Sequence, residues 1–170
     1  IAEIGSSEGG ITDQEAKVFT AAAIAQQETG RPISTHTSFS TMGVEQTRLL
    51  RRQGADLSRV VIGHCDLRDN LDDIMKIIDA GAYVQFDTIG KNGYYPDEKR
   101  IAMLQALRQR GLLARVMLSM DITRRSHLRA NGGIGYGYLL TTFAPRLLAS
   151  GFSPADLNTL LIENPSRFFK

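Results

Sequence analysis

Four side chains of the types that bind divalent metal ions lie within, or at the end of, short apolar runs rich in β-branched residues. These runs and their polar residues are 1–4 with Glu3, 33–36 with His36, 60–64 with His64, and 116–121 with Asp121. Zinc and harder divalent ions accept carboxylate oxygens and imidazole nitrogens as ligands. In an α/β barrel the carboxyl ends of the strands share one mouth, where catalytic residues gather. The sequence therefore predicts a metal-dependent hydrolase.

The spacing of these residues supports a repeated strand and helix unit. Glu3 and His36 are 33 residues apart, His36 and His64 are 28 apart, and His64 and Asp121 are 57 apart, which is about two steps. The skipped strand is Tyr83–Phe86, which Asp87 follows. Because a closed barrel takes about 250 residues, we predict a partial TIM (β/α)8 barrel of about five βα units. Residues 1–170 are predicted to form a single domain, the carboxyl-terminal portion of a longer barrel.

Helices are expected between the strands, with polar caps at their starts and glycines at most of their ends. The expected ranges are 12–29, 70–80, 97–110 and 138–150, and a last helix from Ser153 that Asn164-Pro165 ends. The first begins with the capping box at Thr12 and Glu15, and Gly30, Gly81 and Gly111 stop the first three. This alternation of strand and helix is typical of α/β folds.

Composition excludes several classes of protein. The chain is 42% hydrophobic and 22% charged, with 20 basic and 18 acidic residues and a net charge of +2, so no charge excess favours nucleic acid. No apolar run reaches the roughly 18 residues of a membrane span, and no signal peptide is evident. With one cysteine, Cys65, no internal disulfide can form. We therefore predict a cytoplasmic protein with no nucleic-acid or membrane partner; homo-oligomerisation is left open.

Four short motifs carry a family resemblance. They are Thr35-His36-Thr37, Ile62-Gly63-His64-Cys65-Asp66, Leu118-Ser119-Met120-Asp121 and Glu163-Asn164-Pro165-Ser166-Arg167-Phe168. In order and over essentially all 170 residues, the chain resembles strands four to eight of the phosphotriesterase-related family of the amidohydrolase superfamily. The resemblance implies a barrel that binds two divalent ions, usually zinc.

The resemblance also implies a role for each ligand. Glu3 matches the bridging carboxylate, as in the homology-protein subgroup of the family, whereas many relatives use a carbamylated lysine. His36 and His64 match the ligands of one ion, and Asp121 matches a ligand of the second ion that also handles protons. The second ion takes a His-x-His pair in the family, and the three histidines of this chain, at 36, 64 and 127, form no such pair. The cofactor is therefore predicted to be one or two divalent ions, zinc before others.

Neighbouring polar residues have simpler interpretations. Cys65 adjoins His64, and because successive strand residues face opposite sides, we expect Cys65 to point away from the metal. Asp66 and Asp87 are expected to cap loops or to orient an imidazole rather than to bind metal. The stretch Gly5-Ser6-Ser7-Glu8-Gly9-Gly10 is interpreted as a barrel loop, since it lacks the lysine of a P-loop.

The predicted chemistry is attack by a metal-activated hydroxide on a lactone, carboxylic ester or phosphoester, with Asp121 accepting the proton. Lys91, Arg124 and His127 are predicted to bind substrate and to favour an anionic one, since basic side chains hold phosphate or carboxylate. A neutral organophosphate is disfavoured, because no apolar and aromatic pocket is evident around the loops. The alternatives are a metal-binding or ligand-binding relative without turnover, and an inactive truncated fragment.

Overall fold

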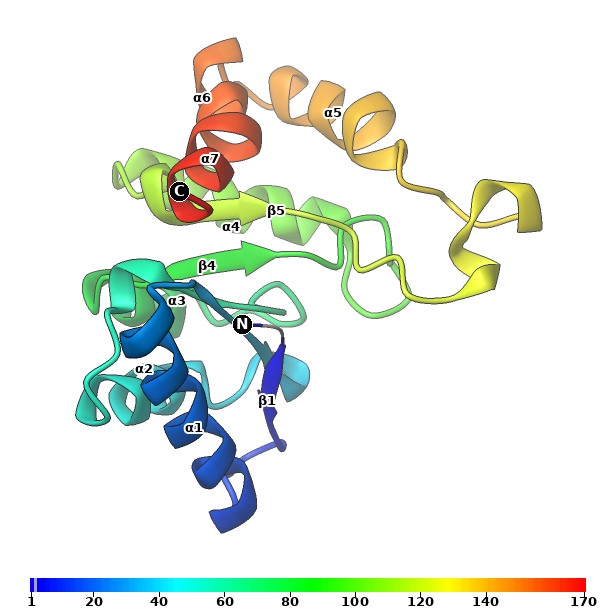
Figure 1. Cartoon of the computed structure of the whole chain (residues 1–170). Coiled ribbons are helices and arrows are strands. Elements are labelled where there is room, and N and C mark those ends of the chain that lie inside the picture. Colours follow the sequence, from blue (N-terminus) through cyan, green and yellow to red (C-terminus); the bar gives the residue numbers. More distant parts are fainter. Residues whose placement is uncertain (2) are drawn as a thin grey trace.

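A five-stranded parallel sheet forms the centre of the computed structural model, which describes Ile1 and residues 3–170 (Figure 1). The strands are β1 (Ile4–Ser6), β2 (Ile33–Thr37), β3 (Val60–Ile62), β4 (Tyr83–Phe86) and β5 (Val116–Leu118). They lie in chain order, and each pairs in parallel with the next. A sheet of this order, with a helix between successive strands, is the repeating pattern of a (β/α)8 barrel. The prediction of a partial barrel is confirmed.

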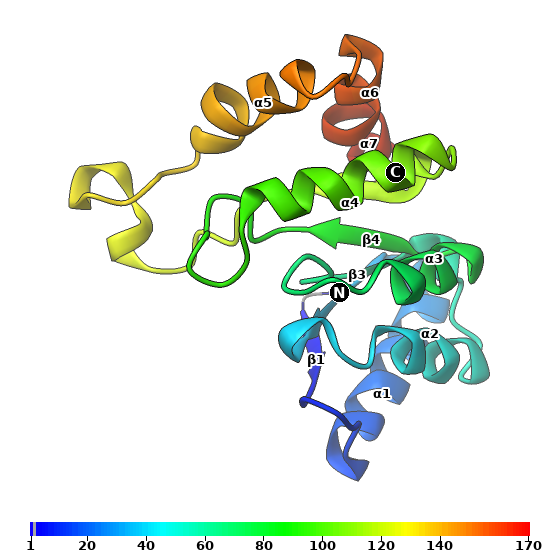
Figure 2. The same cartoon turned by 180° about the vertical axis from the view of Figure 1, so that it is seen from behind.

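A helix lies between each strand and the next, and three further helices follow the last strand (Figures 1 and 2). They are α1 (Asp13–Thr29), α2 (Gly43–Arg52), α3 (Leu71–Asp79), α4 (Asp97–Gln109), α5 (Ala144–Ala149), α6 (Pro154–Asn158) and α7 (Asn164–Phe168). The capping box of Thr12 and Glu15 opens α1 as predicted, and Gly30 ends it with a positive φ. Within the described residues, no helix has the length and apolar character needed to cross a membrane.

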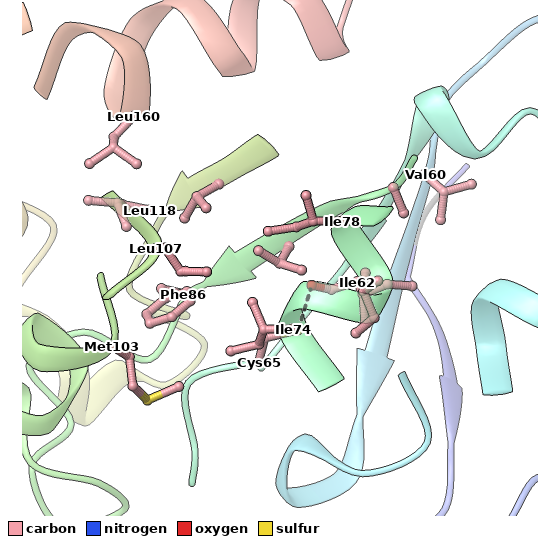
Figure 3. Close-up of a cluster of buried hydrophobic side chains, with 14 of the residues drawn as sticks. Val60, Ile62, Cys65, Ile74, Ile78, Phe86, Met103, Leu107, Leu118 and Leu160 are labelled. Atoms are coloured by element: carbon pink, nitrogen blue, oxygen red, sulfur yellow. Dashed lines mark hydrogen bonds between the residues drawn. The ribbon is translucent and has the colours of Figure 1, made fainter. Parts of the chain in front are cut away.

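The main hydrophobic core lies between the sheet and these helices. Alternate strand residues face it, among them Val60 and Ile62 of β3, Phe86 of β4 and Leu118 of β5. Figure 3 shows these side chains against Ile74, Ile78, Met103, Leu107 and Leu160 from the helices. Burying each such side chain contributes about 1.5 to 3 kcal/mol. Since the alternation is strict, the intervening residues face the opposite side of the sheet.

The opposite side of the sheet holds a second, smaller group of buried residues, which comprises Val61, Tyr83, Met117 and Phe168. It also holds the imidazole of His36, whose backbone pairs with Gly5 across β1 and β2. A Cβ atom on Gly5 would lie 3.3 Å from the Cβ of His36. The missing side chain of Gly5 therefore leaves room beside His36, at the carboxyl end of the sheet.

The first strand differs from the prediction. Residues 1–4 were expected to form it, yet β1 is Ile4–Ser6, which keeps only Ile4 of that range and extends into the stretch 5–10 that was expected to be a loop. Glu3 therefore precedes β1 rather than ending a strand. Glycine and serine have low strand propensity, and pairing of residues 4–6 with Thr35, His36 and Thr37 of β2 overrides it.

Two features of the helices also differ from the prediction. No range was predicted for helix α2, because no polar side chain caps it: its N-cap is Met42, with φ 64°. The last helix was expected to end at Asn164-Pro165, but helical backbone continues to Phe168 through the π-helical segment η7 (Thr159–Glu163). A wider turn directly before Pro165 accommodates a residue that has no N–H to donate.

Candidate metal centre

Three side chains converge beside the carboxyl ends of β2 and β3. One ligand atom from each of Glu3, His36 and His64 lies within 4.8 Å of the other two. Nε2 of His64 is 3.8 Å from Oε1 of Glu3, and the two imidazole rings are 4.6 Å apart and nearly perpendicular. Two ligands with bonds of about 2.1 Å lie roughly 3.4 Å apart in tetrahedral geometry. The donor set, two nitrogens and one oxygen, therefore fits a divalent ion after small side-chain rotations.

Asp121 lies at the same site but not within this triad. It lines the same cavity as both histidines, and its carboxylate pairs with Nζ of Lys91. The Lys91 ammonium also bonds the carbonyl oxygen of Asp121, and the Lys91 side chain is almost fully buried. Lys91 was predicted to contact substrate, whereas its described partner is Asp121.

His64 is held by Asp87, the residue that follows β4. Oδ1 of Asp87 lies 2.7 Å from Nδ1 of His64, and both carboxylate oxygens accept the backbone N–H of His64. A proton on Nδ1 leaves Nε2 free as a ligand toward Glu3 and His36. The expectation that Asp87 orients an imidazole is confirmed, although no spacing rule indicated which histidine it would contact.

The two imidazoles differ in basicity. Burial lowers the pKa of His64, but the hydrogen bond and the charge of Asp87 outweigh burial, and the pKa rises to about 9. Burial raises the pKa of Asp87 to about 6 despite the His64 contact. The pKa of His36 is lowered, first by burial and then by the charge of His64. Near pH 7 without metal, His36 is therefore neutral, and His64 and Asp87 form an ion pair.

The backbone around the site is strained. His64 has φ 53° and Asp121 has φ 46°. Residues other than glycine rarely adopt such values, which cost roughly 1 to 3 kcal/mol each. The turn at His64 is fixed by its neighbours, because Oγ of Ser40 donates to the His64 carbonyl at 2.6 Å and Oγ1 of Thr37 at 3.2 Å. These hydroxyls were not identified from the sequence, and their contacts depend on the loop after β2.

A cavity of about 210 Å³ opens beside the two histidines of the candidate metal centre. His36, His64 and Asp121 line it together with Phe39, Leu67 and Tyr94. Phe39 has a left-handed backbone (φ 51°) and leaves 58% of its surface exposed. The premise that no apolar and aromatic pocket accompanies this site is therefore wrong: two aromatic rings and a leucine lie at the mouth.

The other predicted site residues lie apart from the described cavity lining. Arg124 is exposed, and His127 accepts a 3.4 Å hydrogen bond from the backbone of Thr123 within their own loop. That loop, between β5 and α5, extends away from the body of the molecule (Figure 1). Cys65 is buried in the core, where its thiol donates to the Ile62 carbonyl at 3.3 Å, so it faces away from the site as expected.

The sequence and the fold of the chain match those of known proteins. The model of the phosphotriesterase family matches residues 1–169. The chain belongs to the phosphotriesterase family. It is 75% identical, over all of its 170 residues, to the phosphotriesterase homology protein of Escherichia coli, and it covers 58% of that protein. A crystal structure of that E. coli protein, complexed with phosphate in its active site, superposes with a TM-score of 0.99, with 100% of this chain and 59% of the other covered.

More distant relatives are named hydrolases. The human N-acetyltaurine hydrolase is 33% identical over 181 aligned residues, which cover 99% of this chain and 51% of the human protein. The lactonase Lmo2620 from Listeria monocytogenes is 29% identical, with a TM-score of 0.94 over 99% of this chain and 53% of the lactonase. The chain thus spans about half the length of the curated relatives it matches.

Proposed function

We propose that Glu3, His36 and His64 bind a divalent metal ion, zinc before others, at the catalytic centre of a hydrolase. The convergence of one carboxylate and two imidazoles supports this proposal most directly. A set of two histidines and one glutamate is sufficient for a catalytic zinc with an open position. Asp121, in the same cavity, is the proposed ligand of a second ion. That ion needs further ligands, which the His-x-His pair of the family would supply.

The proposed reaction is cleavage of a lactone, a carboxylic ester or a phosphoester. When bound, the ion would supply a water of lowered pKa and polarise the substrate oxygen. Asp121 is the proposed proton acceptor, since it lines the cavity and the only imidazoles among the described lining residues are the two proposed ligands. Lys91 forms an ion pair with that carboxylate. The lactonase and the phosphate-bound relative support these bond types, and the N-acetyltaurine hydrolases add an N-acyl amide to the substrates worth testing.

The cavity lining favours a substrate with an apolar part. Phe39, Leu67 and Tyr94 present apolar surface near the ligands. The proposal of an anionic substrate depends on Lys91, Arg124 and His127, none of which is among the described residues lining this cavity. We therefore propose a neutral lactone or ester as the substrate in preference to a phosphorylated one. A cytoplasmic location stays a prediction.

The three histidines offer a matched test of the metal site. Zinc binding by the 170-residue chain is measured by calorimetry with a competing chelator, for the wild type, His36→Ala and His127→Ala. We expect His36→Ala to lower the affinity at least 100-fold and His127→Ala to leave it within about twofold, because His127 lies in its own loop. Unchanged affinity in His36→Ala would refute the site. Zinc binding without hydrolysis of any lactone, ester, phosphoester or N-acyl amide, by the chain or by a full-length form, would favour the non-catalytic alternative.

A further inference from the structure

A fully buried arginine lies behind the metal centre. Arg100 of α4 has no exposed surface, and all three guanidinium nitrogens have partners. Nε donates to Oδ2 of Asp66 at 2.8 Å, Nη1 to Oδ1 of Asp97 at 2.9 Å, and Nη2 to Oγ1 of Thr88 at 2.7 Å. Nη1 also donates to the carbonyl of Tyr95. Burying a charge is costly unless it is paired, and here two buried carboxylates pair with it.

The carboxylate of Asp66 holds the end of strand β4. Besides Arg100, it accepts the backbone N–H of Asp87 at 3.3 Å, the backbone N–H of Thr88 at 3.1 Å and the Thr88 hydroxyl at 2.9 Å. Asp66 itself follows His64 by two residues. The pair of Arg100 and Asp66 thus joins the segment after β3 to the segment after β4.

The segment after β4 contains Asp87, whose two carboxylate oxygens both form hydrogen bonds with His64. A small rotation of the Asp87 backbone would lengthen the 2.7 Å contact with Nδ1 of His64. The direction of Nε2 toward Glu3 depends on that contact. The residues therefore form a continuous chain of hydrogen bonds from the core of α4 to a metal ligand.

We propose that Arg100 is a positioning residue, which fixes the tautomer and orientation of the His64 imidazole through Asp66 and Asp87. This inference rests on the proposed function, since it assigns to His64 the role of a metal ligand. The competing interpretation is that Arg100 only fastens α4 to the sheet. The two interpretations differ in a measurable way, because only the first links Arg100 to the geometry of the imidazole.

The test compares Arg100→Lys with two further variants of the same chain. Lysine keeps the positive charge but cannot reach Asp66, Asp97 and Thr88 together. Asp66→Asn removes the charged acceptor that lies between Arg100 and Asp87 in this chain of hydrogen bonds. Asn164→Ala is the control for stability: its buried side chain donates to the carbonyls of Leu113 and Val116, at the amino end of β5 and so at the other end of the sheet.

Two readouts are needed. Long-range proton–nitrogen NMR of the metal-free chain, at a pH above the His64 pKa of about 9, reports which nitrogen of the neutral ring carries the proton, and calorimetry reports zinc affinity. We expect Arg100→Lys and Asp66→Asn to mix the tautomers or mobilise the His64 ring, and to weaken zinc binding about 10- to 100-fold. Asn164→Ala should destabilise the chain yet leave both readouts unchanged.

The outcomes separate the two proposals. Wild-type tautomer and zinc affinity in both Arg100→Lys and Asp66→Asn would overturn the positioning role, and so would equal losses in Asn164→Ala. If the wild type itself fails to bind zinc, the proposed function fails, and the tautomer measurement still decides whether Arg100 positions His64. If Arg100→Lys does not fold, Asp66→Asn decides on the same readouts.

Discussion

Zinc binding should depend strongly on pH because of the pair formed by His64 and Asp87. With a pKa of about 9, His64 is protonated at pH 7, and a metal can bind Nε2 only after one proton leaves. At two pH units below the pKa, that proton weakens apparent affinity by about 100-fold relative to the deprotonated site. The apparent affinity should therefore rise about tenfold per pH unit between pH 6.5 and 8. His36 adds no slope, because its pKa is lowered and it is already neutral.

The comparison with Asp87→Asn isolates the cause. Without the carboxylate, burial lowers the pKa of His64 and only the smaller charge effects of Asp121 and Glu3 raise it, so the pKa falls well below 9. The slope should then flatten at a lower pH than in the wild type, while the affinity at pH 8 falls about 10- to 100-fold because the ring is no longer oriented by a charged partner. Calorimetry at four pH values, corrected for buffer ionisation, measures both effects. A wild-type affinity that does not change with pH, or an identical slope in Asp87→Asn, would refute this reasoning.

The same pair affects the stability of the metal-free chain. The folded-state pKa of His64 lies above its unfolded value, so its stabilising contribution is complete below about pH 6.5 and is lost as the pH rises through about 9. The pKa of Asp87 is also raised, so its contribution falls as the pH rises from the ordinary value of 3.8 to about 6, and above pH 6 Asp87 adds no further change. Urea unfolding of the chelated chain should therefore show falling stability between pH 6.5 and 9. Rising stability across this window would contradict the assignment of a charged pair.

Three further predictions concern single residues. Gly63→Ala should destabilise the chain by about 3 kcal/mol in urea unfolding, because the new Cβ would lie 2.4 Å from the Thr35 carbonyl oxygen, whereas Gly93→Ala enters open space and should be neutral; equal effects would contradict this. Phe39→Ala should raise KM for lactones with apolar side chains more than for small ones, and an equal change for both would remove Phe39 from the substrate site. Asp121→Asn should lower kcat far more than zinc affinity, and the reverse pattern would exclude it as the proton acceptor.

The helices and strands that local patterns specify could be predicted from the sequence. The capping box at Thr12 and the stops at Gly30, Gly81 and Gly111 fixed helix ends, because each acts through its own backbone. Helix α2 has no side-chain cap, so no local pattern indicated its start. The start of β1 depends on pairing with β2, which is a tertiary contact.

The convergence of the proposed metal ligands could be predicted for a related reason, and their surroundings could not. Parallel strands bring their carboxyl ends together, so the spacing of His36 and His64 indicated their convergence. The pairing of Lys91 with Asp121 and the exposure of Arg124 depend on loop conformation, which no periodicity specifies. Arg100 had an overlooked signal: it precedes Met103, Leu104 and Leu107 at helical spacing on the buried face of α4, where a charge requires buried partners.

The identity of the ligand atoms tests the central claim most directly. X-ray absorption spectroscopy of the zinc-loaded chain at pH 8 reports the number and type of atoms bound to the metal. The proposed site predicts two imidazole nitrogens and carboxylate or water oxygen at about 2.0 to 2.2 Å, with no sulfur. A zinc–sulfur distance of about 2.3 Å would place the ion on Cys65, and a first shell without imidazole would exclude His36 and His64; either result would contradict the metal centre described here.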